Sequence, residues 1–307
     1  MKKTILLLLS ITLAKRAYAA AAPKQHISPT IVNGEDAPIN DFPATVSLRR
    51  YYATNAYNIC GGTLIATRFV ATAAHCVYNL VTDPHADRNL FVMYNTSFLS
   101  ANALTAQVKD IVILEAYNDT TLADDVAILE LVSAIDAATA IMSTTPPAFG
   151  EEVKTVGWGY IDLEMNEFPL ILQQTHTFVI TDDCFSTPGA TCTVNANTTV
   201  CPGDSGSGWY KTKGSLVGIT SFTIMNVADP LCQPGSLDGF ARISDYISFF
   251  CFYSENEAYT TAGKCNTTSA GAAGAAIRVS LVDNLSPLPS PPPPSPPPPP
   301  PPPLSPP

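Results

Sequence analysis

Short β-rich runs separated by turn residues recur along most of the chain, and they constrain its fold more than any other feature. Each run is rich in Val, Ile, Leu, Thr or aromatic residues, and few stretches have the apolar spacing of an amphipathic helix. The spacing predicts an all-β sandwich or barrel, with a helix expected only near residues 245–253. The runs cover residues 44–49, 62–66, 91–94, 108–114, 126–131, 153–156 and 216–222.

The composition of the 307-residue chain fits a globular protein with appendages and argues against nucleic acid as a partner. With 46% hydrophobic and 14% charged residues, the chain has enough apolar side chains for a sizeable core. Its net charge is -10, and its 16 Lys and Arg residues are spread thinly. They form no basic stripe of the kind that neutralises phosphates, so nucleic acid is excluded as an expected partner.

The N-terminal end has the character of a targeting segment. Residues 1–19 combine Lys2 and Lys3, an apolar run at 5–13 and a small-residue site that ends at Ala19. This pattern predicts a secretory signal peptide and a secreted, extracellular protein. Residues 20–30 are too few to fold and are expected to form a propeptide, with a linker as the alternative. No later stretch reaches the roughly 18 uninterrupted apolar residues of a membrane span.

The C-terminal end changes composition twice. Residues 266–285 are rich in Thr, Ser, Ala and Gly and are expected to form a linker. Residues 286–307 are almost wholly Pro with interspersed Ser, which predicts a polyproline II rod. Runs such as SPPPPS resemble hydroxyproline-rich cell-wall glycoproteins of plants and green algae, which favours contact with an extracellular matrix or cell wall. The alternative is a stiff spacer without a partner.

Eight cysteines in an exported chain predict disulfides rather than metal ligation. The compartment is oxidising, and none of the cysteine spacings is a zinc pattern. Five Asn-x-Ser/Thr sequences are acceptors for glycosylation in a host that has the machinery, which makes the chain a candidate glycoprotein. They begin at Asn95, Asn118, Asn197, Asn266 and Asn284.

Three motifs carry the groups that nucleophilic attack on a peptide carbonyl requires. A serine hydroxyl is a poor nucleophile at neutral pH, so it needs a base to take its proton and a carboxylate to orient that base. The motifs are ATAAHC with His75, preceded by CGGTL; DDVAILEL with Asp125 before an apolar strand; and CPGDSGSG with Ser205.

The order of these motifs and their surrounding residues resemble the chymotrypsin and trypsin-like serine proteases, from Ile31 to about Tyr253. The resemblance implies two six-stranded antiparallel β-barrels, a short C-terminal helix and an active site in the cleft between the barrels. It also implies a secreted serine endopeptidase, made as a zymogen, whose domain spans residues 31–265. Its expected partners are polypeptide substrates and protein protease inhibitors, and no cofactor or metal is required.

The resemblance assigns a role to each residue of the motifs. His75 is the expected general base and then general acid, Asp125 holds the tautomer of His75, and Ser205 forms the acyl-enzyme. The backbone N–H groups of Gly203 and Ser205 are the expected oxyanion hole. Asp124 is the competing carboxylate. Asp125 is preferred because the aspartate of this family adjoins the apolar strand, which leaves Asp124 as a solvated neighbour.

The sequence IVNG, which begins at Ile31, resembles the mature amino terminus of these enzymes. There, cleavage frees an amino group that is buried against the aspartate before the serine, which is Asp204 in this chain. Thr30 stands where trypsin-activated zymogens carry Arg or Lys. Self-activation by an enzyme that tolerates Thr, and cleavage by a protease of another specificity, both stay open.

The resemblance also implies how the eight cysteines pair. One bond closes the loop that carries His75, one spans a shortened loop, one braces the specificity pocket and one ties down the segment after the last helix. The expected pairs are Cys60 with Cys76, Cys184 with Cys192, Cys201 with Cys232, and Cys251 with Cys265.

The positions that match the substrate pocket of the family leave two specificities open. Thr199 stands at the pocket base, where trypsins have Asp, so a simple preference for Lys or Arg loses its main support. Ser221, Phe222 and Thr223 match the strand that pairs with the substrate backbone. A β-branched Thr223 is expected to narrow the pocket, as in elastases.

Asp238 supports the opposite prediction, a pocket that also accepts basic residues. The stretch LDGFARIS around it resembles crustacean collagenolytic serine proteases, in which an aspartate on the opposite strand enters the pocket and broadens specificity to basic residues. If Pro234 and Gly235 instead match the usual Pro-Gly of the pocket wall, Asp238 is a solvated turn residue.

Two other functions compete with catalysis. A protease homologue that has become catalytically silent binds a partner, although here no member of the triad is lost. In a matrix component, the proline-rich tail is the functional part and the folded domain accompanies it.

Overall fold

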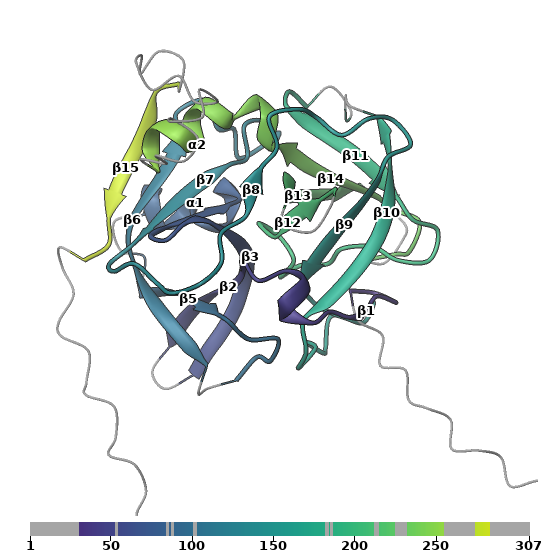
Figure 1. Cartoon of the computed structure of the whole chain (residues 1–307), viewed down its shortest axis with the longest axis horizontal. Helices are drawn as coiled ribbons and strands as arrows, with labels where there is room; N and C mark the ends of the chain where they lie inside the picture. The colour runs from purple at the N-terminus through teal and green to yellow at the C-terminus, as the bar shows by residue number, and fades with distance from the viewer. Residues whose placement is uncertain are drawn as a thin grey trace, which may run out of the picture.

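The computed structural model describes residues 31–282, with gaps at 53–54, 84–85, 87–88, 101–102, 182–183, 185–186, 212–214, 225–231 and 255–273. The expected signal peptide, propeptide and proline-rich tail lie outside the described residues. The described chain forms two barrels that lie side by side (Figure 1). Among these residues, no helix is long and apolar enough to cross a membrane.

The first barrel is a closed antiparallel sheet of six strands. Its strand order is β6-β5-β2-β3-β4-β7, and pairing of β6 with β7 closes it. Apolar side chains such as Leu48, Leu64 and Val92 fill its interior and are fully buried. The strands are β2 (Thr45–Tyr52), β3 (Asn55–Ala66), β4 (Phe69–Thr72), β5 (Leu90–Tyr94), β6 (Leu104–Leu114) and β7 (Ala127–Leu131).

The second barrel repeats this plan in the later half of the chain. Its strand order is β10-β11-β14-β13-β12-β9, and pairing of β9 with β10 closes it. Trp209 stacks on Phe240 in its core, with the ring centroids 5.1 Å apart. The strands are β9 (Glu152–Gly157), β10 (Gln173–Thr181), β11 (Ala190–Val194), β12 (Gly208–Tyr210), β13 (Ser215–Ile224) and β14 (Leu237–Arg242). The predicted pair of six-stranded antiparallel barrels is confirmed.

Short elements complete the fold. The expected C-terminal helix is α2 (Ile247–Tyr253), preceded by the 3-10 turn η3 (Ile243–Asp245). The others are β1 (Glu35–Asp36), η1 (Ile39–Asp41), η2 (Ala74–Cys76), α1 (Tyr78–Thr82) and β8 (Ile141–Met142), which pairs in parallel with β13.

One strand lies in the segment that was expected to be a linker. Residues Ala276–Ser280 form β15, which pairs antiparallel with β6 on the outer flank of the first barrel (Figure 1). Arg278 of β15 reaches Asp110 and Glu130, and Leu281 after it is buried. The linker interpretation is therefore wrong for these residues, because Ala276 and Val279 pack against the hydrophobic core and Arg278 pairs with carboxylates of the first barrel.

Candidate active site

His75 and Asp125 are brought together by the pairing of two strands of the first barrel. His75 lies in η2, just after β4, and Asp125 lies just before β7. In the register of these strands Thr72 pairs with Ala127, so the end of β4 lies beside the start of β7. A histidine that follows one strand and an aspartate that precedes the other consequently meet at the same end of the barrel.

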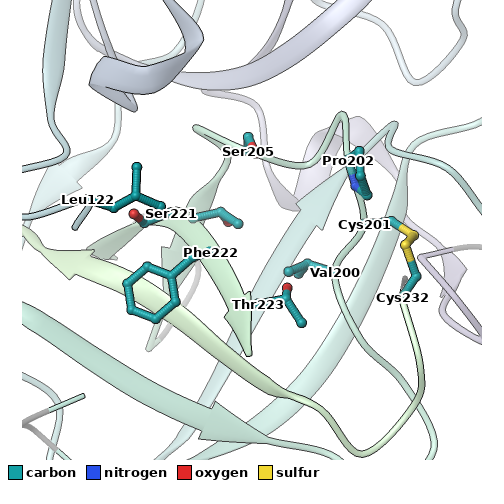
Figure 2. Close-up of a pocket in the computed structure, with 10 residues that line it drawn as sticks. Leu122, Val200, Cys201, Pro202, Ser205, Ser221, Phe222, Thr223 and Cys232 are labelled. Atoms are coloured by element: carbon teal, nitrogen blue, oxygen red, sulfur yellow. A yellow bond between two sulfur atoms is a disulfide. The ribbon is translucent and has the colours of Figure 1, made fainter. Parts of the chain in front are cut away.

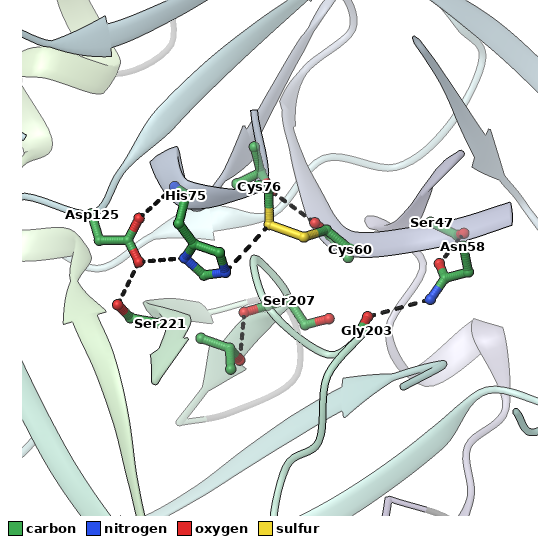
Figure 3. Close-up of a disulfide and its surroundings, with 12 residues drawn as sticks. Ser47, Asn58, Cys60, His75, Cys76, Asp125, Gly203, Ser207 and Ser221 are labelled. Atoms are coloured by element: carbon green, nitrogen blue, oxygen red, sulfur yellow. Dashed lines mark hydrogen bonds and ion pairs between the residues drawn. A yellow bond between two sulfur atoms is a disulfide. The ribbon is translucent and has the colours of Figure 1, made fainter. Parts of the chain in front are cut away.

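Asp125 fixes both the backbone and the ring of His75. One carboxylate oxygen accepts a hydrogen bond from the His75 backbone N–H at 2.9 Å, and the other lies 2.7 Å from Nδ1 (Figure 3). Ser221 of β13 donates a third hydrogen bond to Asp125 at 2.5 Å. The carboxylate is fully buried and held by three donors, which leaves Nε2 as the ring nitrogen free of Asp125.

The electrostatic surroundings favour the protonated form of His75. Burial lowers the pKa of His75, but the hydrogen bond and charge of Asp125, together with the charge of Asp119, outweigh burial, so the pKa lies above its ordinary value. Nε2 lies 3.8 Å from Cys76 Sγ. That sulfur is bonded to Cys60, so this cluster offers no thiolate to a metal ion.

Ser205 lies on the loop that leads into β12, on the wall of a cavity of about 270 Å³ (Figure 2). Its side chain is half-buried, and its carbonyl accepts a hydrogen bond from Gly61 N–H of the first barrel at 2.8 Å. The following Gly206 has φ of 79° and donates to Thr220 O at 2.8 Å. The loop that carries Ser205 is thus held from both barrels.

Gly203 adopts a backbone conformation that other residues would strain. Its φ is 100°, and a Cβ at this position would lie 2.8 Å from Gly159 Cα. Its carbonyl faces Asn58 of β3, whose Nδ2 lies 3.4 Å away. Nothing in the sequence around Asn58 pointed to this contact, because it joins residues 145 positions apart.

Asp204 is a buried carboxylate without a cationic partner among the described residues. It accepts hydrogen bonds from Gly159 N–H at 2.7 Å and Cys201 N–H at 3.0 Å. Burial raises the pKa of Asp204 to about 7, against these two hydrogen bonds, which lower it. Ile31, the residue expected to pair with it after cleavage, is 1% exposed in the uncut chain.

The cavity beside Ser205 has mainly apolar walls. Leu122 stands at one side, a residue that the sequence did not single out and that has φ of 55°. Ser221, Phe222 and Thr223, the residues expected to pair with the substrate backbone, form part of the wall (Figure 2). The remaining lining residues are Val200, Cys201, Pro202, Thr220 and Cys232.

Asp238 lies in β14, where it pairs in the strand register with Thr223, a residue of the cavity wall. It is 1% exposed, so the alternative of a solvated turn residue is wrong. Its carboxylate accepts hydrogen bonds from Thr199 Oγ1 at 2.7 Å, Thr223 Oγ1 at 3.1 Å and Val200 N–H at 3.4 Å. Thr199 is also buried, and neither it nor Asp238 is among the residues that line the cavity.

Burial raises the pKa of Asp238 to about 7; its three donors lower it and the charge of Asp204 raises it further. Among the described residues, no cationic side chain pairs with Asp238. A carboxylate with this pKa changes its charge close to neutral pH.

Asp124 is held in place rather than simply solvated. It has φ of 57°, and its carboxylate accepts a hydrogen bond from Tyr246 O–H at 3.1 Å. The expectation of a solvated neighbour is corrected on this point, because Tyr246 reaches Asp124 from the turn before α2.

The disulfides follow the expected pairing where the structure describes both partners. They join Cys60 to Cys76, Cys184 to Cys192 and Cys201 to Cys232. Cys251 is also disulfide-bonded. Its expected partner, Cys265, lies outside the described residues.

Comparison with known proteins places this geometry in a family. The Trypsin family model matches residues 31–249. The chain is 30% identical over 250 residues to a trypsin of Phaedon cochleariae, covering 75% of this chain and 93% of that protein. It is 31% identical over 237 residues to the serine protease SP24D of Anopheles gambiae, covering 71% and 79%. It is 28% identical over 240 residues to the trypsin Blo t 3 of Blomia tropicalis, covering 71% and 84%.

Proposed function

The chain belongs to the trypsin family of serine proteases and is a serine-type endopeptidase, and from this premise we propose that His75, Asp125 and Ser205 are its catalytic triad. The observation that carries the proposal is the pair of hydrogen bonds between Asp125 and His75, at the end of the first barrel, together with Ser205 on the wall of a cavity. Asp125 binds Nδ1, so Nε2 is the nitrogen left to act as a base.

The reaction proceeds in two steps through an acyl-enzyme. His75 Nε2 takes the proton of Ser205 Oγ as the oxygen attacks the peptide carbonyl, and then gives that proton to the leaving amine. A water molecule, deprotonated in the same way, attacks the acyl carbon, and the proton returns to Ser205 Oγ. Asp125 holds the ring through Nδ1 and stabilises the imidazolium form, in keeping with the raised pKa of His75.

Gly203 and Ser205 supply the oxyanion hole through their backbone N–H groups. The negative charge that develops on the carbonyl oxygen is stabilised by donors that are already oriented before the reaction. The positive φ of Gly203 supports this assignment, because a side chain at this position would prevent the loop from adopting its shape.

Cleavage before Ile31 is the proposed activation step. The new α-amino group pairs with Asp204, whose buried carboxylate lacks a cation in the uncut chain among the described residues. Asp204 stands between Gly203 and Ser205 in the sequence. The ion pair therefore stabilises the loop that carries both residues in its active shape.

The chain is proposed to be secreted as a zymogen. Residues 1–19 are the signal peptide, 20–30 the propeptide, and the protease domain begins at Ile31 and includes β15. The proline-rich residues 286–307 are proposed to contact an extracellular matrix or cell wall. The substrates are polypeptides, and protein protease inhibitors are the proposed regulators.

The cavity supports a mixed preference for the residue before the scissile bond. Its apolar walls and Thr223 suit an apolar side chain of medium size, such as Leu. Asp238 accepts hydrogen bonds from the hydroxyls of Thr199 and Thr223. When it is ionised, it supplies a negative charge that attracts the side chain of Lys or Arg. We therefore propose that both classes are cleaved.

The test is hydrolysis of peptides by recombinant protein that begins at Ile31. Replacing Ser205→Ala is expected to lower kcat by about a thousandfold or more, because no nucleophile remains. Ser207→Ala is the matched control: this neighbouring hydroxyl is buried on the same loop, and activity should persist without it. A folded, correctly processed enzyme that hydrolyses none of the peptides would instead favour a silent homologue that binds a partner.

A further inference from the structure

Asn58 joins the first barrel to the loop that carries the oxyanion hole. It lies in β3, and its Nδ2 donates to two carbonyls that belong to the second half of the chain. These are Trp158 O at 3.2 Å and Gly203 O at 3.4 Å, and Figure 3 shows the contact with Gly203. The side chain thus bridges the two barrels at the residue whose N–H is proposed to bind the oxyanion.

The orientation of the Asn58 amide is fixed by a second residue of the first barrel. Ser47 of β2 is buried, and its hydroxyl donates to Asn58 Oδ1 at 2.6 Å. An amide oxygen held by this donor leaves the NH₂ group directed at the two carbonyls. The Ser47 hydroxyl therefore meets the amide oxygen, and the two carbonyls meet the amide NH₂ group. An amide rotated by 180° would place its oxygen against the carbonyls instead.

Gly203 needs such an external restraint. With no Cβ and a φ of 100°, it has more backbone freedom than any other residue type, and no side chain of its own to limit that freedom. The hydrogen bond to its carbonyl limits rotation about Gly203 and so limits where its N–H points. Oxyanion stabilisation depends on donors that are already aimed when the charge develops.

We propose that Asn58 is a positioning residue for the oxyanion hole: its amide, oriented by Ser47, holds the Gly203 carbonyl and thereby aims the Gly203 N–H at the reacting carbonyl oxygen. The proposal rests on the proposed serine mechanism. It assigns Asn58 no contact with the substrate, so its effect belongs to the transition state rather than to substrate binding.

The decisive variant is Asn58→Asp in the enzyme that begins at Ile31. A carboxylate has nearly the same shape but no N–H, so it leaves both carbonyls without a donor and turns an acceptor toward them. We expect kcat to fall about tenfold or more with KM nearly unchanged, as for lost oxyanion stabilisation. The affinity for a peptide aldehyde, whose hemiacetal oxygen occupies the oxyanion hole, should fall in the same proportion.

Two further variants separate positioning from general damage. Ser47→Ala frees the amide to turn, and a smaller loss of kcat, about threefold, is expected, since one net hydrogen bond is lost. Asn95→Asp places the same added charge on an exposed turn of the first barrel and should leave kcat and aldehyde affinity unchanged. If Asn58→Asp does not fold, Asn58→Ala removes the same donor, and the same pattern is expected.

Either of two results overturns the proposal. One is wild-type kcat and aldehyde affinity in a folded Asn58 variant; the other is a raised KM with unchanged kcat, which would assign Asn58 to substrate binding. Failure of the serine mechanism itself is a separate result, because it would show as activity that survives Ser205→Ala.

Discussion

Asp238 is a buried carboxylate that accepts a hydrogen bond from Thr223 in the wall of the cavity. Burial raises its pKa to about 7, and the hydroxyls of Thr199 and Thr223 are neutral donors that do not compensate its charge. Among the described residues, Asp204 is the other charged group that acts on it. The proposed preference for Lys or Arg should therefore depend on pH in a way that the preference for Leu does not.

We predict that the ratio of kcat/KM for a Lys substrate to kcat/KM for the matching Leu substrate rises about tenfold between pH 6 and pH 8. Below pH 7 Asp238 is mostly protonated and neutral, and above pH 7 it is mostly ionised, so the ionised fraction itself rises about tenfold. His75 titrates in both reactions and cancels in the ratio. Asp238→Asn should give a ratio that is flat with pH; a ratio that is flat in the unmodified enzyme would remove Asp238 from substrate recognition.

The sequence could predict the candidate residues that lie within a distinctive sequence motif. It could not predict the residues whose surroundings depend on how the strands pair. His75 and Ser205 lie in sequence motifs that are typical of their proposed roles. Their assignment to a triad stays a prediction to be tested by mutation. Asp238 was left between two interpretations, because only the register of β13 and β14 decides whether it is buried. Asn58 gave no signal, since its partners come from distant parts of the chain.

At the level of elements, all seven β-rich runs fall in strands apart from the first residues of two of them, 44 and 126, and several of the missed strands share a physical cause. β12 has only three residues and begins with Gly208, β14 contains Asp238 and Gly239, and β10 is polar over its first residues. Such sequences have weak intrinsic preference for a strand, and the pairing with neighbours decides their conformation. The same holds for β15, which is hidden within a segment rich in Ala, Gly, Ser and Thr.

β15 is predicted to stabilise the protease domain. A chain that ends at residue 270 keeps Cys265 but loses β15, and its unfolding midpoint should fall by about 5 °C or more. Burial of Leu281 alone contributes about 2 kcal/mol, and 1 kcal/mol corresponds to about 2–4 °C in a domain of this size. The measurement is thermal unfolding in the Ser205→Ala background, which prevents self-digestion.

A chain that ends at residue 285 is the control for this truncation. It loses only the proline-rich tail, and its midpoint should equal that of the full chain. Arg278→Ala should give an intermediate result, because it removes the contacts to Asp110 and Glu130 but leaves the strand pairing. Equal midpoints for both truncated chains would show that β15 contributes nothing to stability.

At the scale of the whole molecule, the proposed cleavage before Ile31 would link the start of the domain to the loop of Ser205. In the uncut chain Asp204 is buried with a pKa of about 7, whereas an unfolded Asp has a pKa of about 3.8. A carboxyl group whose pKa is raised by folding favours the folded state most at low pH, and this contribution is lost as pH rises through the folded pKa. A protonated α-amino group on Ile31 would pair with the ionised Asp204, and the folded state would then no longer lose stability as the carboxyl group gives up its proton.

We predict that the unfolding midpoint of the cut protein exceeds that of the uncut protein, and that the difference grows from pH 5 to pH 7.5. Across this range the Asp204 carboxyl of the uncut chain would lose its proton without a cation, while the α-amino group of the cut chain stays largely protonated. The measurement is thermal unfolding of both forms in the Ser205→Ala background. Asp204→Asn in both forms should abolish the dependence of the difference on pH. A difference that is constant with pH in the unmodified pair would mean that Ile31 stabilises the loop by packing alone, and the proposed ion pair would be wrong.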